Sequence, residues 1–167
     1  MKQPSKQIYF DLETDGLLDE VTKIHCLIYK CDGEHHVVYE KDIPEALLFL
    51  KDHHLIGHNI LGFDFRVLDK LYGFVPVSYT DTLILSRLTF PELRALDFDK
   101  RGMDSKMYGS HALKAWGHRL SFLKGDYGDH DGAWDELTTE MVEYCKRDVD
   151  LTQRLHEHLL NYEKHTS

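Results

Sequence analysis

The sequence predicts one α/β domain, spanning residues 1–167, in which helices flank a sheet. Three observations predict this class. The first third contains apolar, β-prone runs separated by turn residues, the middle alternates short apolar runs with helix-periodic segments, and the end is mainly helical in its periodicity. No internal repeat or low-complexity linker interrupts the 167 residues. A chain of this length buries roughly 68–70% of its unfolded surface around one core.

The first third predicts three strands. Residues 7–10 form a short apolar run that is typical of a buried strand, and residues 24–30 and 36–39 are two further β-prone runs. Asp32 and Gly33 stand between the second and third runs, and Asp-Gly is a strong hairpin signal. We therefore expect a three-strand meander at the start of the domain.

The middle of the chain alternates helix and strand patterns. Pro44 stands in the first turn of a helix-periodic segment, and Gly73 follows the end of another. The predicted elements are a helix over 44–51, a strand over 54–58, a helix over 64–71, a strand over 77–80 and a helix over 83–88.

The remainder of the chain predicts a long excursion followed by helices. Residues 91–109 are polar and contain glycine, which indicates a long loop of a kind that is often functional. The elements predicted after it are a helix that Ser110 caps and that ends near Arg119, a loop over 125–132, and a last helix that Thr138 or Thr139 caps and that reaches about Tyr162.

The composition excludes several classes of protein. Hydrophobic residues make up 42% of the chain and charged residues 29%, which is ordinary for a globular protein and unlike a disordered one. The net charge of -9 argues against duplex-DNA binding by broad phosphate neutralisation, although cations held by acidic side chains neutralise phosphate locally. Cys26, Cys31 and Cys145 lack metal-ligand spacing and indicate reduced packing residues of a cytosolic protein. No apolar run approaches the roughly 20 residues of a membrane span, so we expect no membrane partner.

Two acidic residues follow the first predicted strand. Asp11 and Glu13 are two positions apart, and alternate residues of an extended chain point to the same face. Paired carboxylates suit a hard divalent cation such as Mg²⁺, which keeps open positions for a substrate phosphate. The alternative is an ordinary strand-end turn.

Two further acidic residues stand in helical contexts. Asp64 opens a predicted helix, where the helix dipole alone would stabilise a carboxylate. Tyr144 and Asp148 are four positions apart in the last helix, so they share one face. A tyrosine packed beside a solvated aspartate is the alternative for this pair.

Together these segments resemble the three motifs of the proofreading 3′→5′ exonucleases. Residues 11–14 (Asp-Leu-Glu-Thr) resemble the first motif, residues 59–64 the second, and Tyr144 with Asp148 the third. The tyrosine selects the DEDDy subclass, because position 143, where the other subclass has histidine, is Glu143. Residues 109–120 are very similar to a helix of the exonuclease domain in phage-type family A DNA polymerases, and residues 21–26 and 81–88 also resemble stretches there.

The resemblance covers residues 8–160 and implies a fold and a mechanism. The fold is ribonuclease H-like, with a mixed five-stranded sheet in which the meander is joined by parallel strands. The mechanism uses two divalent cations, Mg²⁺ or Mn²⁺. Asp11 would bridge both cations, Glu13 and Asp148 would complete the site that activates water, and Asp64 would support the second cation. Tyr144 would orient the attacking water, because a phenol with a pKa near about 10 is a poor base at neutral pH.

The resemblance also implies a substrate. The enzyme would release nucleoside 5′-monophosphates from the 3′ end of single-stranded DNA, with Leu17 as an apolar wedge between the terminal bases. Thr14 and Asn59 would contact the terminal nucleotide, while local turn hydrogen bonds are the alternative role for both.

No polymerase domain follows in this sequence, so the alternatives are a stand-alone exonuclease, a subunit that acts with a separate polymerase, and an excised fragment. A DNA polymerase in trans is the partner expected of such a subunit. The expected location is the cytoplasm, or the host-cell cytoplasm for a phage protein. The competing hypotheses are an exoribonuclease, which shares this chemistry, and a non-catalytic domain of a replication complex.

Overall fold

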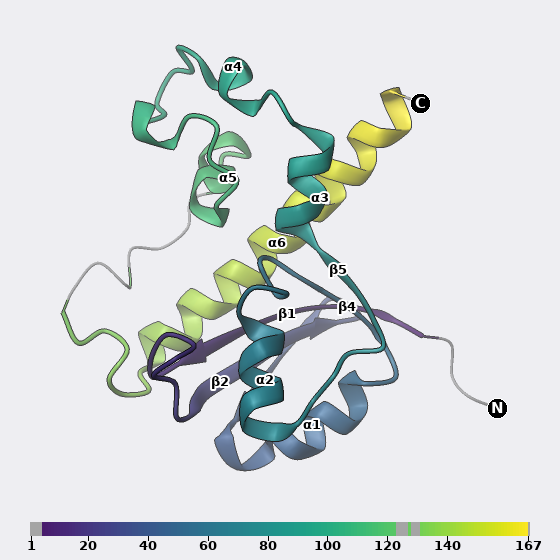
Figure 1. Cartoon of the computed structure of the whole chain (residues 1–167), viewed down its shortest axis with the longest axis vertical. Helices are drawn as coiled ribbons and strands as arrows, with labels where there is room; N and C mark the ends of the chain where they lie inside the picture. The colour runs from purple at the N-terminus through teal and green to yellow at the C-terminus, as the bar shows by residue number, and fades with distance from the viewer. Residues whose placement is uncertain (1–4, 123–126, 128–130, 167) are drawn as a thin grey trace.

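A computed structural model describes residues 5–122, 127 and 131–166 (Figure 1). Its centre is a five-stranded mixed sheet with the strand order β3-β2-β1-β4-β5. The antiparallel strands are β1 (Gln7–Thr14), β2 (Ile24–Cys31) and β3 (Glu34–Tyr39), and the strands that add in parallel are β4 (His54–Gly57) and β5 (Ser78–Asp81). The predicted meander and the two later strands are thereby confirmed.

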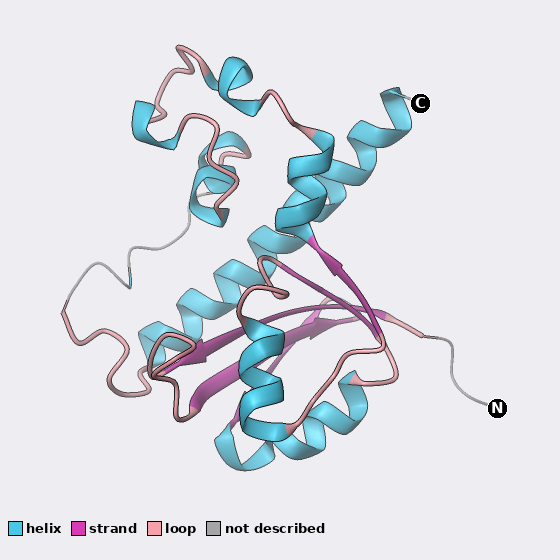
Figure 2. Ribbon diagram, viewed as in Figure 1, coloured by secondary structure: helices cyan, strands magenta, loops and turns pink. Residues whose placement is uncertain are grey.

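Helices cover both faces of the sheet (Figure 2). The longest helix, α6, crosses one face, and α1 and α2 lie on the other (Figure 1). The helices are α1 (Ile43–Leu50), α2 (Asp64–Tyr72), α3 (Thr82–Thr89), α4 (Leu93–Asp97), α5 (Leu113–Arg119) and α6 (Thr139–Thr166), with 3-10 turns at Glu40–Asp42 and Ser105–Met107. In the part of the chain that the structure describes, no helix has the length and apolarity needed to cross a bilayer.

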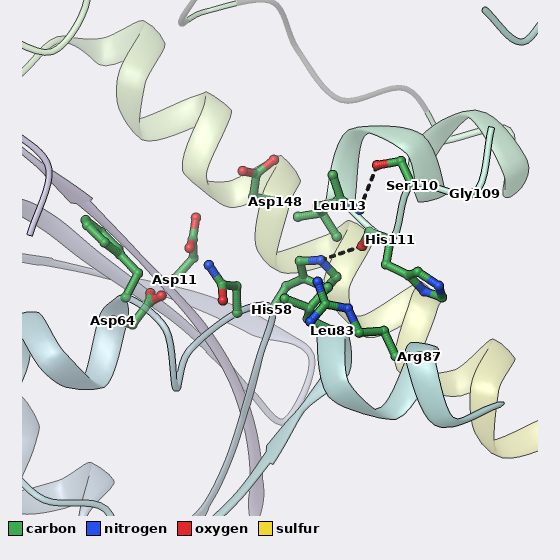
Figure 3. Close-up of a pocket in the computed structure, with 13 residues that line it drawn as sticks. Asp11, His58, Asp64, Leu83, Arg87, Gly109, Ser110, His111, Leu113 and Asp148 are labelled. Atoms are coloured by element: carbon green, nitrogen blue, oxygen red, sulfur yellow. Dashed lines mark hydrogen bonds between the residues drawn. The ribbon is translucent and has the colours of Figure 1, made fainter. Parts of the chain in front are cut away.

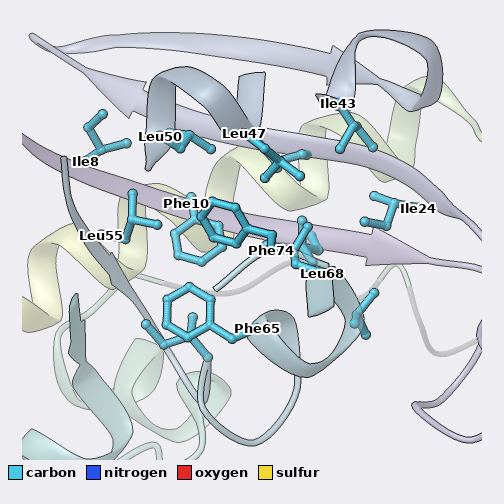
Figure 4. Packing of buried hydrophobic residues seen from close by; sticks show 14 of the residues in the cluster. Ile8, Phe10, Ile24, Ile43, Leu47, Leu50, Leu55, Phe65, Leu68 and Phe74 are labelled. Atoms are coloured by element: carbon cyan, nitrogen blue, oxygen red, sulfur yellow. The ribbon is translucent and has the colours of Figure 1, made fainter. Parts of the chain in front are cut away.

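Strand β1 divides its side chains between two different environments. Ile8, Phe10 and Leu12 are buried in the apolar cluster between the sheet and helices α1 and α2 (Figure 4). Asp11 and Glu13 alternate with them and therefore face α6. The strand continues past the predicted end at residue 10, because backbone pairing with β2 extends to Thr14.

The segment between α3 and α5 corrects one prediction. Residues 91–109 are not a continuous loop, since they contain α4 and the 3-10 turn. A second apolar cluster attaches the segment to α6, and its members include Phe90, Leu93, Trp116, Leu151 and Leu155. These contacts order a segment whose local sequence looks irregular.

The predicted helix caps are only partly correct. Ala112, not Ser110, is the N-cap of α5, and the Ser110 hydroxyl accepts a hydrogen bond from the Ala112 amide at 3.2 Å. The Thr138 hydroxyl accepts from the Met141 amide at 3.1 Å, which selects Thr138 as the cap of α6. Helix α6 runs to Thr166, beyond the predicted end. Most of the predicted loop over 125–132 lies outside the described residues.

Candidate active site

Three separate elements bring acidic side chains to one cavity (Figure 3). Asp11 comes from β1, Asp64 from the first turn of α2, and Asp148 from the middle of α6. All three line a cavity of about 770 Å³, together with Asn59. The structure therefore places side by side three carboxylates that are far apart in the sequence.

The other predicted residues of the first motif line a neighbouring cavity of about 410 Å³. Glu13, Thr14 and Leu17 lie there with Trp134, and Phe63 lines both cavities. Leu17 is 76% exposed, as a wedge between bases would be. The Thr14 hydroxyl donates to the Gly16 carbonyl at 2.8 Å, which is the local turn bond expected as its alternative role.

Asp64 is a buried carboxyl with an unsatisfied oxygen. Its side chain is 4% exposed, and its Oδ1 atom has no hydrogen-bond partner among the described residues. Burial, and then repulsion from the Asp11 carboxylate, raises the pKa of Asp64 well above its ordinary value. A divalent cation between the two carboxylates would remove both penalties. The oxygen donor set suits Mg²⁺ or Mn²⁺.

The Cys145 thiol also reaches this group. Its Sγ atom donates to Oδ2 of Asp11 at 3.6 Å. Three ligand atoms lie within 4.8 Å of one another: a carboxylate oxygen of Asp11, a carboxylate oxygen of Glu13 and the Sγ atom of Cys145. Burial, followed by a hydrogen bond with Cys26, raises the pKa of the Cys145 thiol well above its ordinary value.

Tyr144 is half-buried and lies among aromatic side chains. Its ring meets that of Trp134 edge-on with centroids 5.7 Å apart, and the ring of Tyr127 lies 5.8 Å away. The Tyr127 hydroxyl in turn donates to the Ala133 carbonyl at 2.5 Å. Tyr144 is not among the described residues that line the larger cavity, so its predicted contact with the attacking water is not visible in this arrangement.

Asp81 organises the turn that carries Asn59. Its carboxylate accepts hydrogen bonds from the amides of Asn59 (2.9 Å), Leu61 (3.0 Å) and Leu83 (3.0 Å). Asn59 adopts φ 60, a left-handed conformation that asparagine tolerates better than most residues. A Cβ atom on Gly62 would lie 2.4 Å from Oδ1 of Asn59, so a larger residue there would displace the Asn59 side chain.

The opposite wall of the cavity is residues 109–112, and two histidines fix it in place. His58 Nε2 donates to the His111 carbonyl at 2.9 Å, which joins the end of β4 to this wall. The His111 ring Nδ1 lies 2.9 Å from the Ser86 hydroxyl of α3. Burial, and then the positive charges of Arg119 and Arg87, lowers the pKa of His111.

A buried ion pair supports the same wall from behind. Arg119 donates to both carboxylate oxygens of Asp97, at 2.8 Å and 2.7 Å, and both side chains are almost fully buried. The second oxygen also accepts from the Gly109 amide at 2.8 Å. Gly109 has φ +76, a conformation that favours glycine. The pair therefore fixes the residue that precedes Ser110 and His111.

Sequence reasoning did not assign a site role to Asp97, Arg119 or Arg87. Arg87 is the one lysine or arginine among the described residues that line the larger cavity, on the side where Leu83 and His111 lie (Figure 3). Its spacing of four from Leu83 on a helix is the signal that would have placed both on one face. Asp81 is the N-cap of α3, and its carboxylate accepts from the Leu83 amide.

Comparison with known proteins finds relatives that match nearly the whole chain. The profile of the 3′-5′ exonuclease family matches residues 1–162. The DNA-directed DNA polymerases of Enterobacteria phage T3 and Escherichia phage T7 are 34% and 33% identical over 93% and 95% of the chain. The chain spans only 26% and 27% of their lengths.

Solved structures share the ribonuclease H-like fold. Brucella melitensis NrnC has a TM-score of 0.71 at 21% identity, over 97% of this chain and 75% of that one. Escherichia coli RNase D has a TM-score of 0.63 at 15% identity, over 96% of this chain and 40% of that one. The family match extends over nearly all of the sequence, and the fold agrees with it. The chain belongs to the 3′-5′ exonuclease family.

Proposed function

We propose that residues 1–167 form one metal-dependent exonuclease domain that removes nucleoside 5′-monophosphates from the 3′ end of single-stranded DNA. The observation that carries the proposal is the convergence of Asp11, Asp64 and Asp148, from three elements, on one cavity. Carboxylates of like charge at a buried site repel one another unless a cation or a proton offsets the charge, and the oxygen donor set suits a cation.

The chain's carboxylates are the ligands in this proposal. Asp11 lies close to both Glu13 and Asp64, so its carboxylate would contact two cations. Glu13 from β1 and Asp148 from α6 would hold the first of them. Bound Mg²⁺ or Mn²⁺ supplies Lewis acidity at the scissile phosphate and at the attacking water. A structure of NrnC contains bound Mg²⁺, which supports a divalent cation for this fold.

Tyr144 and its aromatic neighbours have a positioning role in the proposal. The phenol hydroxyl would hold the attacking water by a hydrogen bond, and the ring contacts with Trp134 and Tyr127 would keep the side chain on the α6 face. In the described arrangement the Tyr144 ring packs against the rings of Trp134 and Tyr127. Binding of the substrate would turn the Tyr144 hydroxyl toward the cavity.

The two cavities suggest how a strand end would lie. The terminal nucleotide would occupy the space between Leu17 and Phe63, with Thr14 and Asn59 at hand to contact its sugar. The next phosphate toward the 5′ end would meet Arg87, whose exposed guanidinium has no ion-pair partner among the described residues. A cation at this end offsets the acidic character of the rest of the cavity.

DNA is favoured over RNA by the relatives with the greater sequence identity, since both are DNA polymerases. From the similarity to these DNA polymerases, we propose a polymerase acting in trans as the partner. The second candidate is an exoribonuclease, because RNase D is named as an exoribonuclease involved in structured RNA processing and shares the fold. The 2′-hydroxyl group is the feature of the substrate that separates the two candidates.

The proposal is tested by digesting matched 5′-labelled DNA and RNA oligonucleotides with Mg²⁺ or Mn²⁺. We expect a ladder that shortens by single nucleotides, with DNA degraded faster than RNA. Asp64→Asn should remove the activity, whereas Asp69→Asn, an exposed position on the same helix, should retain it. Faster degradation of RNA would transfer the proposal to the second candidate, and no degradation of either would overturn both.

A further inference from the structure

The thiol of Cys145 has no part in the proposed reaction, yet it contacts the carboxylate of Asp11. Cys145 lies three positions before Asp148 on α6, and its side chain is 0% exposed. Its Sγ atom donates to Asp11 at 3.6 Å and belongs to the set of ligand atoms from Asp11, Glu13 and Cys145 that lie within 4.8 Å of one another. The fold therefore brings one sulfur atom and two carboxylate oxygens close together.

A second observation indicates that the surroundings of Asp11 accept a cation. The buried Oδ1 atom of Asp64 has no hydrogen-bond partner among residues 5–122, 127 and 131–166, and Asp64 is close enough to Asp11 to repel it. Figure 3 shows the two carboxylates beside each other on the acidic side of the cavity. The orphaned oxygen is independent of the thiol and calls for positive charge beside Asp11, the carboxylate that the thiol contacts.

The donor atoms determine which cations can use the thiol. Mg²⁺ takes oxygen ligands and leaves sulfur uncoordinated, whereas Zn²⁺ and Cd²⁺ bind cysteine sulfur strongly. We propose that Asp11, Glu13 and Cys145 form a site for thiophilic divalent cations, in which two carboxylate oxygens and one sulfur bind Zn²⁺ or Cd²⁺. On binding, the Sγ–H bond breaks, the sulfur–metal bond forms from the same electron pair, and the proton passes to solvent.

This site overlaps the one proposed for Mg²⁺ or Mn²⁺, because both use Asp11 and Glu13. A thiophilic cation therefore displaces the proposed catalytic cation and stops hydrolysis. That consequence rests on the proposed function, but binding itself does not. The cysteine thus confers on the site a sensitivity to zinc and cadmium that oxygen ligands alone would not give.

The direct test is a titration of the metal-free protein with Cd²⁺, read by the ultraviolet charge-transfer absorption of the cadmium–sulfur bond. We expect the band to saturate at one equivalent in the wild type and to be absent in Cys145→Ser. Serine keeps a hydroxyl donor for Asp11 and removes the sulfur, so Mn²⁺ affinity measured by electron paramagnetic resonance should stay unchanged. Cd²⁺ affinity should fall by at least about 100-fold, because loss of a residue that only supports a metal ligand already costs up to about that much.

Two further variants exclude other sulfurs as the source of the band. Cys31→Ser changes a buried cysteine outside the cluster, and Cys26→Ser changes the neighbour on β2 that faces Cys145. Both should retain the band. If Cys145→Ser does not fold, as judged by near-ultraviolet circular dichroism, Cys145→Ala takes its place. A band that persists without the Cys145 sulfur, or no band in the wild type, would overturn the site.

Nuclease assays separate this inference from the proposed function. Cd²⁺ added to the Mn²⁺-loaded enzyme should inhibit the wild type at least tenfold more strongly than Cys145→Ser. If the wild type shows the band and degrades no nucleic acid, the proposed function fails and the metal site stands. If the wild type degrades DNA and shows no band, the metal site fails and the proposed function stands.

Discussion

The ion pair between Asp97 and Arg119 offers a perturbation with a magnitude that follows from the structure. The side chains are 2% and 5% exposed, and the guanidinium is bound by both carboxylate oxygens. Asp97→Ala would leave the arginine charged and buried, which costs about 3–5 kcal/mol of unfolding free energy in comparable pairs. The loss of the bond to Gly109 adds to that figure.

Urea denaturation measures the effect. With a slope of roughly 2 kcal/mol per molar urea, the midpoint of Asp97→Ala should fall by roughly 2 M. Glu143→Gln is a matched control, because it breaks the exposed pair with Lys146 and should change the stability by less than about 0.5 kcal/mol. Asp97→Leu combined with Arg119→Met removes both charges and should recover part of the loss.

The same variant tests the link from the ion pair to the site. Without the bond to Asp97, Gly109 is released and the wall formed by Ser110 and His111 loses its support. At a temperature where the Asp97→Ala protein is folded, the KM of this variant should therefore rise more than its kcat falls. A urea midpoint equal to that of the wild type would refute the assignment of the buried pair. A normal midpoint shift with an unchanged KM would refute its role in shaping the cavity.

Three further outcomes are expected. Asp81→Asn can keep two of its three backbone bonds but must present an amide donor to the third N–H group, so urea denaturation should show a loss of about 1–2 kcal/mol, and an unchanged midpoint would contradict the assignment. Tyr144→Phe keeps its ring contacts and loses its hydroxyl, so turnover should slow about tenfold to a hundredfold at unchanged thermal stability, whereas a wild-type rate would exclude a role for the hydroxyl. Burial opposes ionisation of Asp97, but bonds from Arg119 and Gly109 outweigh it and lower its pKa, so its stabilisation is complete above about pH 5 and is lost as the pH falls through the depressed folded pKa. Urea curves of the wild type and Asp97→Ala should therefore converge at acidic pH, and a constant difference down to pH 2 would refute this account.

The parts of the fold that local sequence determines were predictable. The alternation of Phe10, Asp11 and Leu12 fixes which face of β1 each side chain occupies, and the Asp-Gly pair fixes the hairpin. Spacing alone left each acidic residue with an ordinary structural role, and the resemblance to the exonuclease motifs is what predicted that they converge. Asp64 does open α2, and Asp148 from α6 lines the same cavity as Asp11 (Figure 3).

The wall of the cavity was not predictable in the same way. Its order depends on Asp97 meeting Arg119 across 22 positions and on α4 and α5 packing against α6, and neither contact leaves a periodic signal in the local sequence. The role inferred for Cys145 depends on its contact with Asp11 across 134 positions. From the sequence alone, a cysteine on an apolar helix face is interpreted as a packing residue. Its contact with Asp11 becomes apparent only when the position of β1 is known.

The central claim is that Asp11 belongs to a site for cation-dependent hydrolysis from the 3′ end. The most direct measurement is time-resolved electrophoresis of a 5′-labelled single-stranded DNA oligonucleotide, incubated with purified wild type, Asp11→Asn and the exposed-site control Asp19→Asn in Mg²⁺ or Mn²⁺ and in EDTA. We predict a ladder of single-nucleotide steps from the 3′ end for the wild type and the control, and intact DNA for Asp11→Asn and for every protein in EDTA. Equal degradation by Asp11→Asn, or degradation that persists in EDTA, would contradict the claim.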